Sequence, residues 1–206
     1  EGKTFCSINI STVFALSEKK TVIVGLDLRK PKLFNDFGIP NDVGVVNYLI
    51  GTHNLDEVTF ATAVPYLDLI PAGPLPPNPG ELLMSENLVD LIAKLKEKYD
   101  YIILDTAPVG LVSDALELSN FADVVLYVVR QNYTKKGMIS QLNLRHKRDE
   151  LKNVSIVFND FESKATGYGY GYGYGYGYGY GGYADGYVED LPEKKNIFKR
   201  ILRHMK

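Results

Sequence analysis

The 206-residue sequence is poor in cysteine, in net charge and in long apolar runs. A single cysteine, Cys6, cannot form an internal disulfide, which favours a reducing cytoplasm. No run approaches the roughly 18–20 apolar residues that cross a bilayer, and the start shows no signal-peptide pattern, so we expect no membrane-spanning helix in these residues. The formal charge is −2, and no basic stripe with interleaved aromatics appears before residue 161, which argues against a nucleic-acid partner.

Hydrophobic residues make up 45% of the chain and gather before about residue 160. This distribution predicts one domain over 1–161 and a tail over 162–206. Within the domain, short apolar runs alternate with segments of helical spacing, so we expect strands at 21–26, 66–71, 101–104, 122–130 and 154–159 and helices at 4–19 and 86–99. The pattern predicts an α/β domain of three layers, with a mostly parallel sheet covered on both faces. Ligands of such sheets bind at the carboxyl ends of the strands.

A proline-rich segment, Pro71 to Gly80, holds five prolines in ten residues. Because proline fixes φ and lacks an N–H donor, we expect an extended and fairly stiff loop without helix or strand. A role at a ligand site and a plain surface connection both remain open for it.

The tail alternates glycine and tyrosine, a composition that we expect to be disordered because it has no opposite face to pack. Nine of the fifteen tyrosines lie there and are candidate phosphate acceptors: Tyr168, Tyr170, Tyr172, Tyr174, Tyr176, Tyr178, Tyr180, Tyr183 and Tyr187. The last stretch, 194–206, has the pattern of a basic amphipathic helix, either at an anionic membrane surface or as a solvated end.

The tripeptide Gly2-Lys3-Thr4 matches the GK[ST] end of a nucleotide phosphate loop. In that motif, backbone N–H groups at a helix N-terminus hold the phosphates. Lys3 would reach the β- and γ-phosphates of ATP, and the Thr4 hydroxyl would ligate Mg²⁺. The tripeptide alone is common by chance, so its value depends on the acids that follow.

Two acids come directly after apolar strands. Asp105 follows YIIL, the arrangement of an acid that holds the metal of a bound nucleotide. Asp27 follows TVIVGL, where it would help place a divalent cation or accept a proton from an attacking hydroxyl. Arg29, two residues on, would steady either a phosphate or an acidic neighbour, and a surface salt bridge is the competing interpretation.

The motifs, taken in order, resemble the bacterial tyrosine kinase (BY-kinase) family. They are GKT, an apolar strand with DLRKP, then PAGPLPPNPGELL, YDYIILDTAP and the tyrosine cluster, and the resemblance runs from Glu1 to Tyr187. That family has a P-loop fold unrelated to eukaryotic protein kinases. The resemblance implies that Lys3 and Thr4 belong to the Walker A motif, Asp27 and Arg29 to a motif called Walker A′, and Asp105 to Walker B.

The resemblance also implies a function. It points to a protein-tyrosine autokinase that transfers the γ-phosphate of ATP, with Mg²⁺, to the tail tyrosines of a neighbouring subunit in a ring. Family members act at the cytoplasmic face of the bacterial inner membrane, with an inner-membrane chain-length regulator in the same or a separate chain. They control the export of capsule or exopolysaccharide.

The sequence departs from the family pattern at Gly25, where Walker A′ has its first aspartate. One carboxylate near the metal is therefore missing. Either Asp27 and Asp105 suffice or catalysis is weakened. We also expect a strand and the leading residues of the phosphate loop to precede Glu1.

Three rival interpretations stay open. The first is a P-loop ATPase of the partition or division-site kind, which hydrolyses ATP without making phosphotyrosine. The second is a regulator that binds nucleotide without catalysis because of Gly25. The third treats the Gly-Tyr tract as an adhesive low-complexity segment, which leaves the phosphate-loop motifs unexplained.

Overall fold

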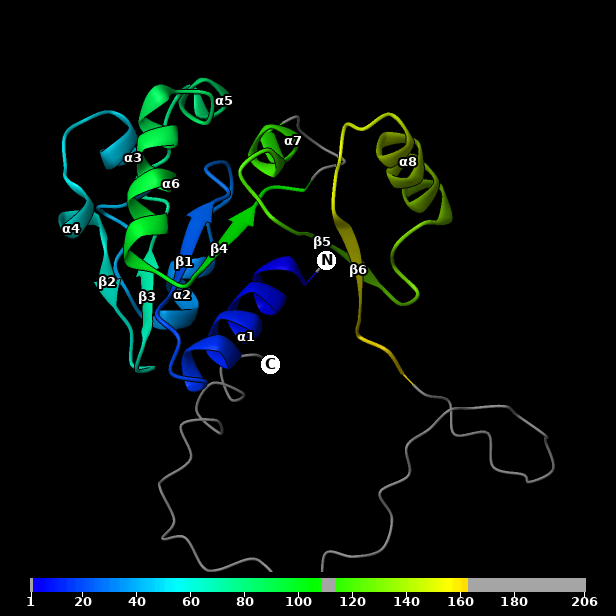
Figure 1. Ribbon diagram of the computed structural model, residues 1–206, viewed down its shortest axis with the longest axis horizontal. Coiled ribbons are helices and arrows are strands. Elements are labelled where there is room, and N and C mark those ends of the chain that lie inside the picture. The colour runs from blue at the N-terminus through cyan, green and yellow to red at the C-terminus, as the bar shows by residue number, and fades with distance from the viewer. Residues whose placement is uncertain (1, 109–113, 163–206) are drawn as a thin grey trace, which may run out of the picture. The chain divides into compact units, whose positions relative to one another are not determined.

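The computed structural model describes residues 2–108 and 114–162 (Figure 1). The chain divides into two units, Glu1–Phe161 and Glu162–Lys206, and the fold described below is that of the first. The tyrosine cluster and the basic segment 194–206 lie outside the described residues, so the expectations about them stay predictions.

A four-stranded sheet organises the first part of this unit, in the order β2-β3-β1-β4. Its strands are β1 (Thr21–Leu26), β2 (Phe60–Ala61), β3 (Leu67–Ile70) and β4 (Tyr101–Thr106). The central strand β1 runs parallel to both β3 and β4, and only the two-residue β2 is antiparallel. Because β1 and β4 pair in register, Gly25 lies directly beside Asp105. The carboxyl ends of the two strands therefore meet at one edge.

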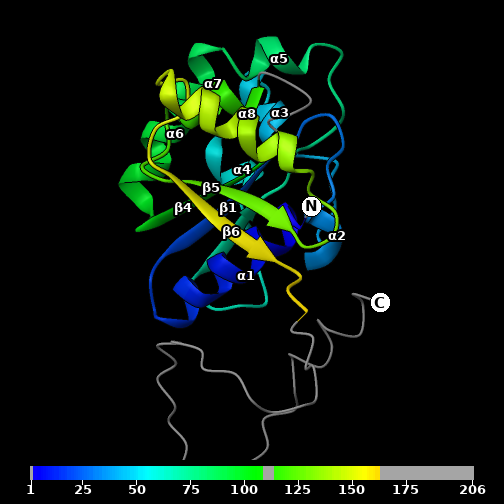
Figure 2. The same cartoon turned by 90° about the vertical axis from the view of Figure 1, so that its right-hand side faces the viewer.

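A second, two-stranded sheet follows, made of β5 (Val125–Arg130) and β6 (Val154–Asn159). The two strands are parallel and lie side by side (Figure 2). Parallel neighbours need a crossover, and here helix α8 (Lys136–Lys147) supplies it. Every described strand except β2 thus belongs to a parallel ladder.

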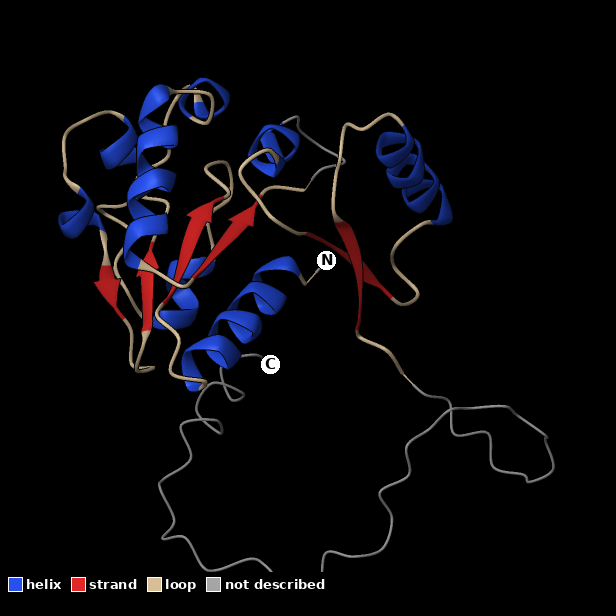
Figure 3. Cartoon of the chain, viewed as in Figure 1, coloured by secondary structure: helices blue, strands red, loops and turns tan. Residues whose placement is uncertain are grey.

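Helices cover both faces of the four-stranded sheet (Figure 3). On one face, α1 (Lys3–Leu16) and α2 (Leu33–Phe37) enclose a cluster that includes Ile23 of β1. On the other face lie α3 (Val45–Leu49), α4 (Leu55–Val58), α6 (Glu86–Lys98) and α7 (Asp114–Ser119), which pack around Val22 and Val24. Side chains alternate between the faces of a strand, so a strand that is apolar throughout feeds both cores. The predicted three-layer α/β fold with a mostly parallel sheet is confirmed.

Most predicted elements lie where the sequence placed them, including strands 21–26 and 154–159 and helix 86–98. The expectation of no helix between Pro71 and Gly80 was wrong at its end, because α5 (Pro79–Leu82) begins there. Proline suits the first position of a helix, where its missing N–H has no partner to lose. The single-turn helices, α7 and β2 were not predicted, because two to six residues carry too little periodicity to detect. The twelve-residue α8 was also missed, because Leu142 is its one buried residue and it therefore lacks a clear apolar stripe.

None of the described helices is both long and apolar enough to span a membrane.

Candidate active site

Helix α1 begins at the predicted phosphate loop. Its N-cap residue, Gly2, has φ 89°, a left-handed conformation that favours glycine. A Cβ added to Gly2 would also overlap the side-chain amide of Asn159, at the end of β6. The first turn holds no acidic residue and no side chain caps it, so its N–H groups remain available to an anion. The start of α1 is therefore suited to phosphate.

Asp105 lies in β4 beside this helix and is only 5% exposed. The Thr4 hydroxyl donates a hydrogen bond of 2.8 Å to its Oδ2, and the Ser7 hydroxyl donates one of 3.2 Å to its Oδ1. Thr4 and Ser7 lie three residues apart on one face of α1, so a single helix face presents both hydroxyls to the carboxylate. The structure thus joins two of the predicted site residues, Thr4 and Asp105, and adds Ser7.

The electrostatic state of Asp105 is unusual for an aspartate. Burial raises its pKa above the ordinary value, because desolvation disfavours the charged form. The hydrogen bonds from Thr4 and Ser7 and the positive charge of Lys3 oppose this rise, and the charge of Asp27 adds to it. Among the described residues no cation pairs with Asp105 within 4.0 Å. A buried carboxylate held only by neutral hydroxyls is a favourable partner for a cation.

Asp27 follows β1 and is partly buried. Its Oδ1 accepts hydrogen bonds from the backbone N–H groups of Arg29, at 3.3 Å, and Lys30, at 3.0 Å. An aspartate that bonds its own backbone two and three residues on forms a local turn. One carboxylate oxygen is fixed by this turn, while Oδ2 accepts no hydrogen bond from the described residues.

Arg29 pairs with an aspartate that sequence reasoning missed. Its Nε donates to Oδ2 of Asp114 at 2.9 Å, and its Nη2 donates to Oδ1 at 3.3 Å. The fork of bonds raises the pKa of the guanidinium further. Asp114 is 7% exposed at the start of α7, so the pair ties the segment after β1 to that helix. Arg29 was expected to bind either a phosphate or an acidic neighbour, and in the structure it binds the acidic neighbour Asp114.

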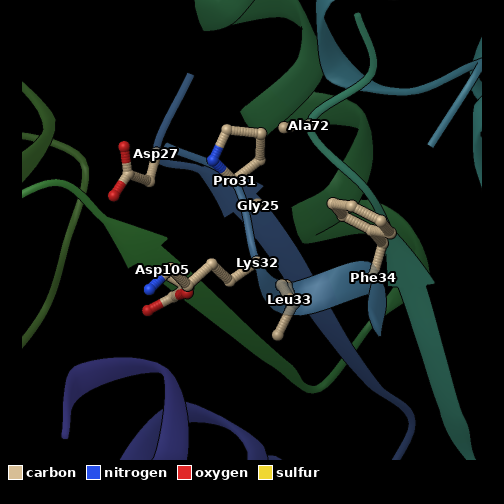
Figure 4. A pocket seen from close by; sticks show the side chains of 8 residues that line it. All are labelled: Gly25, Asp27, Pro31, Lys32, Leu33, Phe34, Ala72 and Asp105. Atoms are coloured by element: carbon tan, nitrogen blue, oxygen red, sulfur yellow. The ribbon is translucent and has the colours of Figure 1, made fainter. Parts of the chain in front are cut away.

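A small pocket opens where β1 and β4 end (Figure 4). It is lined by Gly25, Asp27, Pro31, Lys32, Leu33, Phe34, Ala72 and Asp105. A Cβ added to Gly25 would lie 3.1 Å from the backbone nitrogen of Ala72, so a larger residue there requires a small shift of the segment that follows β3. The missing side chain leaves the pocket with two carboxylates instead of three.

Sequence reasoning found the two acids and the start of α1, and it missed Ser7, Lys32, Asp114 and Asn159. Helical spacing from Thr4 would have indicated Ser7. Asp114 carries no local signal, because its partner is 85 residues away. The candidate acceptor tyrosines lie outside the described residues.

The residues present fit a bound Mg²⁺. Carboxylate and hydroxyl oxygens are the ligands that Mg²⁺ prefers, and the ion usually takes one or two carboxylates together with phosphate oxygens and water. Within residues 2–108 and 114–162, no cluster of three or more His, Cys, Asp or Glu side chains could hold a metal by itself. The site suits an ion that arrives with nucleotide phosphates.

Sequence comparison places this architecture among known proteins. The AAA domain family matches residues 1–156. The tyrosine-protein kinase ptk of Acinetobacter johnsonii is 38% identical over 81% of this chain and 23% of its own length. The tyrosine-protein kinase CpsD of Streptococcus agalactiae is 31% identical over 82% of this chain and 73% of its own length. The chain therefore spans about a quarter of ptk and nearly three quarters of CpsD.

Structural comparison agrees. The kinase domain of the Escherichia coli tyrosine kinase ETK superposes with a TM-score of 0.75 and 32% identity, covering 84% of this chain and 68% of that one. The septum site-determining protein MinD of Pyrococcus horikoshii, solved with Mg-ADP, gives a TM-score of 0.59 at 21% identity over 76% of this chain and 63% of that one. The MinD likeness shows a shared P-loop NTPase-like fold alone. With the phosphate-loop helix, its buried acid and these relatives, the chain belongs to the bacterial tyrosine kinase family.

Proposed function

We propose that this chain is the catalytic domain of a protein-tyrosine autokinase, which transfers the γ-phosphate of ATP to tyrosines of its own C-terminal cluster in trans. The observation that carries the proposal is the contact between Thr4, in the first turn of α1, and the buried carboxylate of Asp105. This contact supports the proposal because it joins a helix start suited to phosphate and an acid suited to a metal at one end of the sheet.

The proposed roles follow from these positions. Gly2 and the first turn of α1 hold the phosphates, and Lys3 neutralises charge on the β- and γ-phosphates. Thr4, Asp27 and Asp105 would hold Mg²⁺, which when bound offsets the negative charge of the phosphates. Asp105 also keeps Thr4 in place through their hydrogen bond.

The proposed transfer is an in-line displacement at the γ-phosphorus. The phenol oxygen of a tyrosine forms the new P–O bond, and the bond to the bridging oxygen of ADP breaks. The phenol of an unperturbed tyrosine has a pKa near 10 and is protonated at neutral pH. Asp27, whose Oδ2 accepts no hydrogen bond from the described residues, is the candidate either to accept its proton or to align the hydroxyl.

The proposal extends to assembly and location. The tail of one subunit would enter the site of another in a ring, at the cytoplasmic face of the inner membrane, with an inner-membrane activator in cis or in trans. Each phosphorylated tyrosine adds a charge of about −1.5 to −2, so a modified tail would repel its neighbours and loosen the ring. The relatives named as tyrosine-protein kinases, one of them in a cps region, support a role in capsule or exopolysaccharide production.

The decisive experiment is mass spectrometry of the C-terminal cluster after incubation with ATP and Mg²⁺. We expect phosphate on tyrosines between 168 and 187 in the wild type and none in Lys3→Met. Mixing Lys3→Met with a variant whose cluster tyrosines are all phenylalanine tests transfer in trans, because phosphate on the Lys3→Met chains must then come from the other subunit.

The same reaction separates the rivals. ATP hydrolysis without phosphotyrosine would indicate an ATPase of the partition type, and nucleotide binding without either reaction would indicate a regulator. An absence of nucleotide binding in the folded wild type would refute the proposal.

A further inference from the structure

The pocket between β1 and β4 contains one cation that the proposed function does not use. Among the residues that line it, Lys32 is the one with a positive charge, and it shares the pocket with Asp27 and Asp105. Figure 4 shows its side chain extending from the start of α2 toward Asp105.

Lys32 is free to meet a ligand. Its residue is the N-cap of α2 and is exposed. Within the described part of the chain, no carboxylate lies within 4.0 Å of its ammonium group. Arg29, on the same segment, differs, because both oxygens of Asp114 already occupy its guanidinium. Of the three cations on the segment after β1, Arg29 is committed to Asp114, Lys30 is outside the pocket lining, and Lys32 lines the pocket.

The position of Lys32 complements that of Lys3. The charge of Lys3 acts on Asp105 from the side of α1, and Lys32 approaches the same carboxylate from the side of α2. A phosphate held at the start of α1, beside Asp105, would thus have Lys3 on one side and Lys32 on the other. Gly25, beside Asp105, carries no side-chain charge that would repel a phosphate there.

We propose that Lys32 contacts the terminal phosphate of bound ATP and makes the site prefer ATP to ADP. The inference rests on the proposed function, since it takes the start of α1 as the phosphate site. The γ-phosphate is the part of ATP that ADP lacks, so a lysine that reaches it alone stabilises one nucleotide and not the other. After transfer, ADP loses this contact and leaves more easily.

The test is equilibrium binding of fluorescent ATP and ADP analogues, with Mg²⁺, to the full chain and its variants. A hydrogen bond to a charged group implies that Lys32→Met weakens ATP binding roughly 10-fold to 100-fold. We expect its ADP binding to change less than about twofold, because ADP does not reach Lys32 in this scheme. Lys32→Arg keeps the charge and should retain the preference for ATP.

Lys96→Met is the matched control, because Lys96 is an exposed lysine of α6 outside the pocket. It reports the effect of losing one surface charge, which we expect to be small and equal for the two nucleotides. Equal weakening of ATP and ADP by Lys32→Met, or an effect no larger than that of the control, would overturn the inference while leaving the kinase proposal intact. A wild type that binds neither nucleotide would instead refute the proposed function.

Discussion

Replacing Asp105 with asparagine should make the nucleotide-free domain more stable while it damages the site. Burial of an ionised carboxylate costs several kcal/mol, and hydrogen bonds to a charged group offset about 1.5–3 kcal/mol each. Asp105 has two such bonds and, among the described residues, no paired cation. Asparagine keeps the shape, and the hydroxyls of Thr4 and Ser7 can either donate or accept, so both bonds can persist.

The expected gain in the free energy of unfolding is about 1–2 kcal/mol at pH 7, in the range of other single stabilising substitutions. For a domain of this size the melting temperature changes by about 2–4 °C per kcal/mol, so we expect a rise of about 2–8 °C. Differential scanning calorimetry without nucleotide measures it. Asp56→Asn is the control, because the Asp56 side chain is 89% exposed and makes one surface ion pair.

The stabilising effect of Asp105→Asn should depend on pH. Burial raises the pKa of Asp105 in the folded state above its unfolded value. Below the unfolded value, near pH 4, the group is protonated in both states and costs nothing. As the pH rises through the folded pKa, the folded state must hold a buried charge, and the free energy of unfolding of the wild type falls. The advantage of Asp105→Asn should therefore be small near pH 4 and complete at higher pH.

Two results would refute this reasoning. One is a melting temperature of Asp105→Asn at pH 7 that does not exceed that of the Asp56→Asn control. The other is a difference between wild type and Asp105→Asn that does not change between pH 4 and pH 8. Mg²⁺ and ATP should raise the melting temperature of the wild type more than that of Asp105→Asn, because the variant has lost a proposed metal ligand.

Gly25→Asp should destabilise the nucleotide-free domain by about 1–3 kcal/mol, because its Cβ crowds the backbone of Ala72, and should strengthen Mg²⁺ binding by restoring a third carboxylate. Calorimetry and a Mg²⁺ titration check the two effects, and an unchanged melting temperature would contradict the crowding. Asp114→Asn should speed amide hydrogen exchange in residues 27–32, because the guanidinium of Arg29 loses its charged acceptor. Mass spectrometry measures the exchange, with strand 67–70 as the internal reference, and equal protection in both proteins would show that the pair does not hold this segment.

The sequence by itself determined the layers of the fold. TVIVGL is a nearly continuous apolar run, which predicts cover on both faces, and β1 is buried at every position. Both β1 and β6 have the predicted bounds. The acids at strand ends were visible for the same reason, since Asp27 and Asp105 interrupt apolar runs. Periodicity and the residue type at a strand end are properties of short segments, so they can be predicted from the sequence.

Only the tertiary structure decided which of these groups meet. The partner of Arg29 is 85 residues away, and the hydroxyls of Thr4 and Ser7 lie 101 and 98 residues from the carboxylate that they bind. Such pairs depend on the order β2-β3-β1-β4, which sets β1 beside β4 and α1 across both. The burial that shifts the pKa of Asp105 arises in the same way, because desolvation belongs to the packed sheet and helix and not to any segment of the chain.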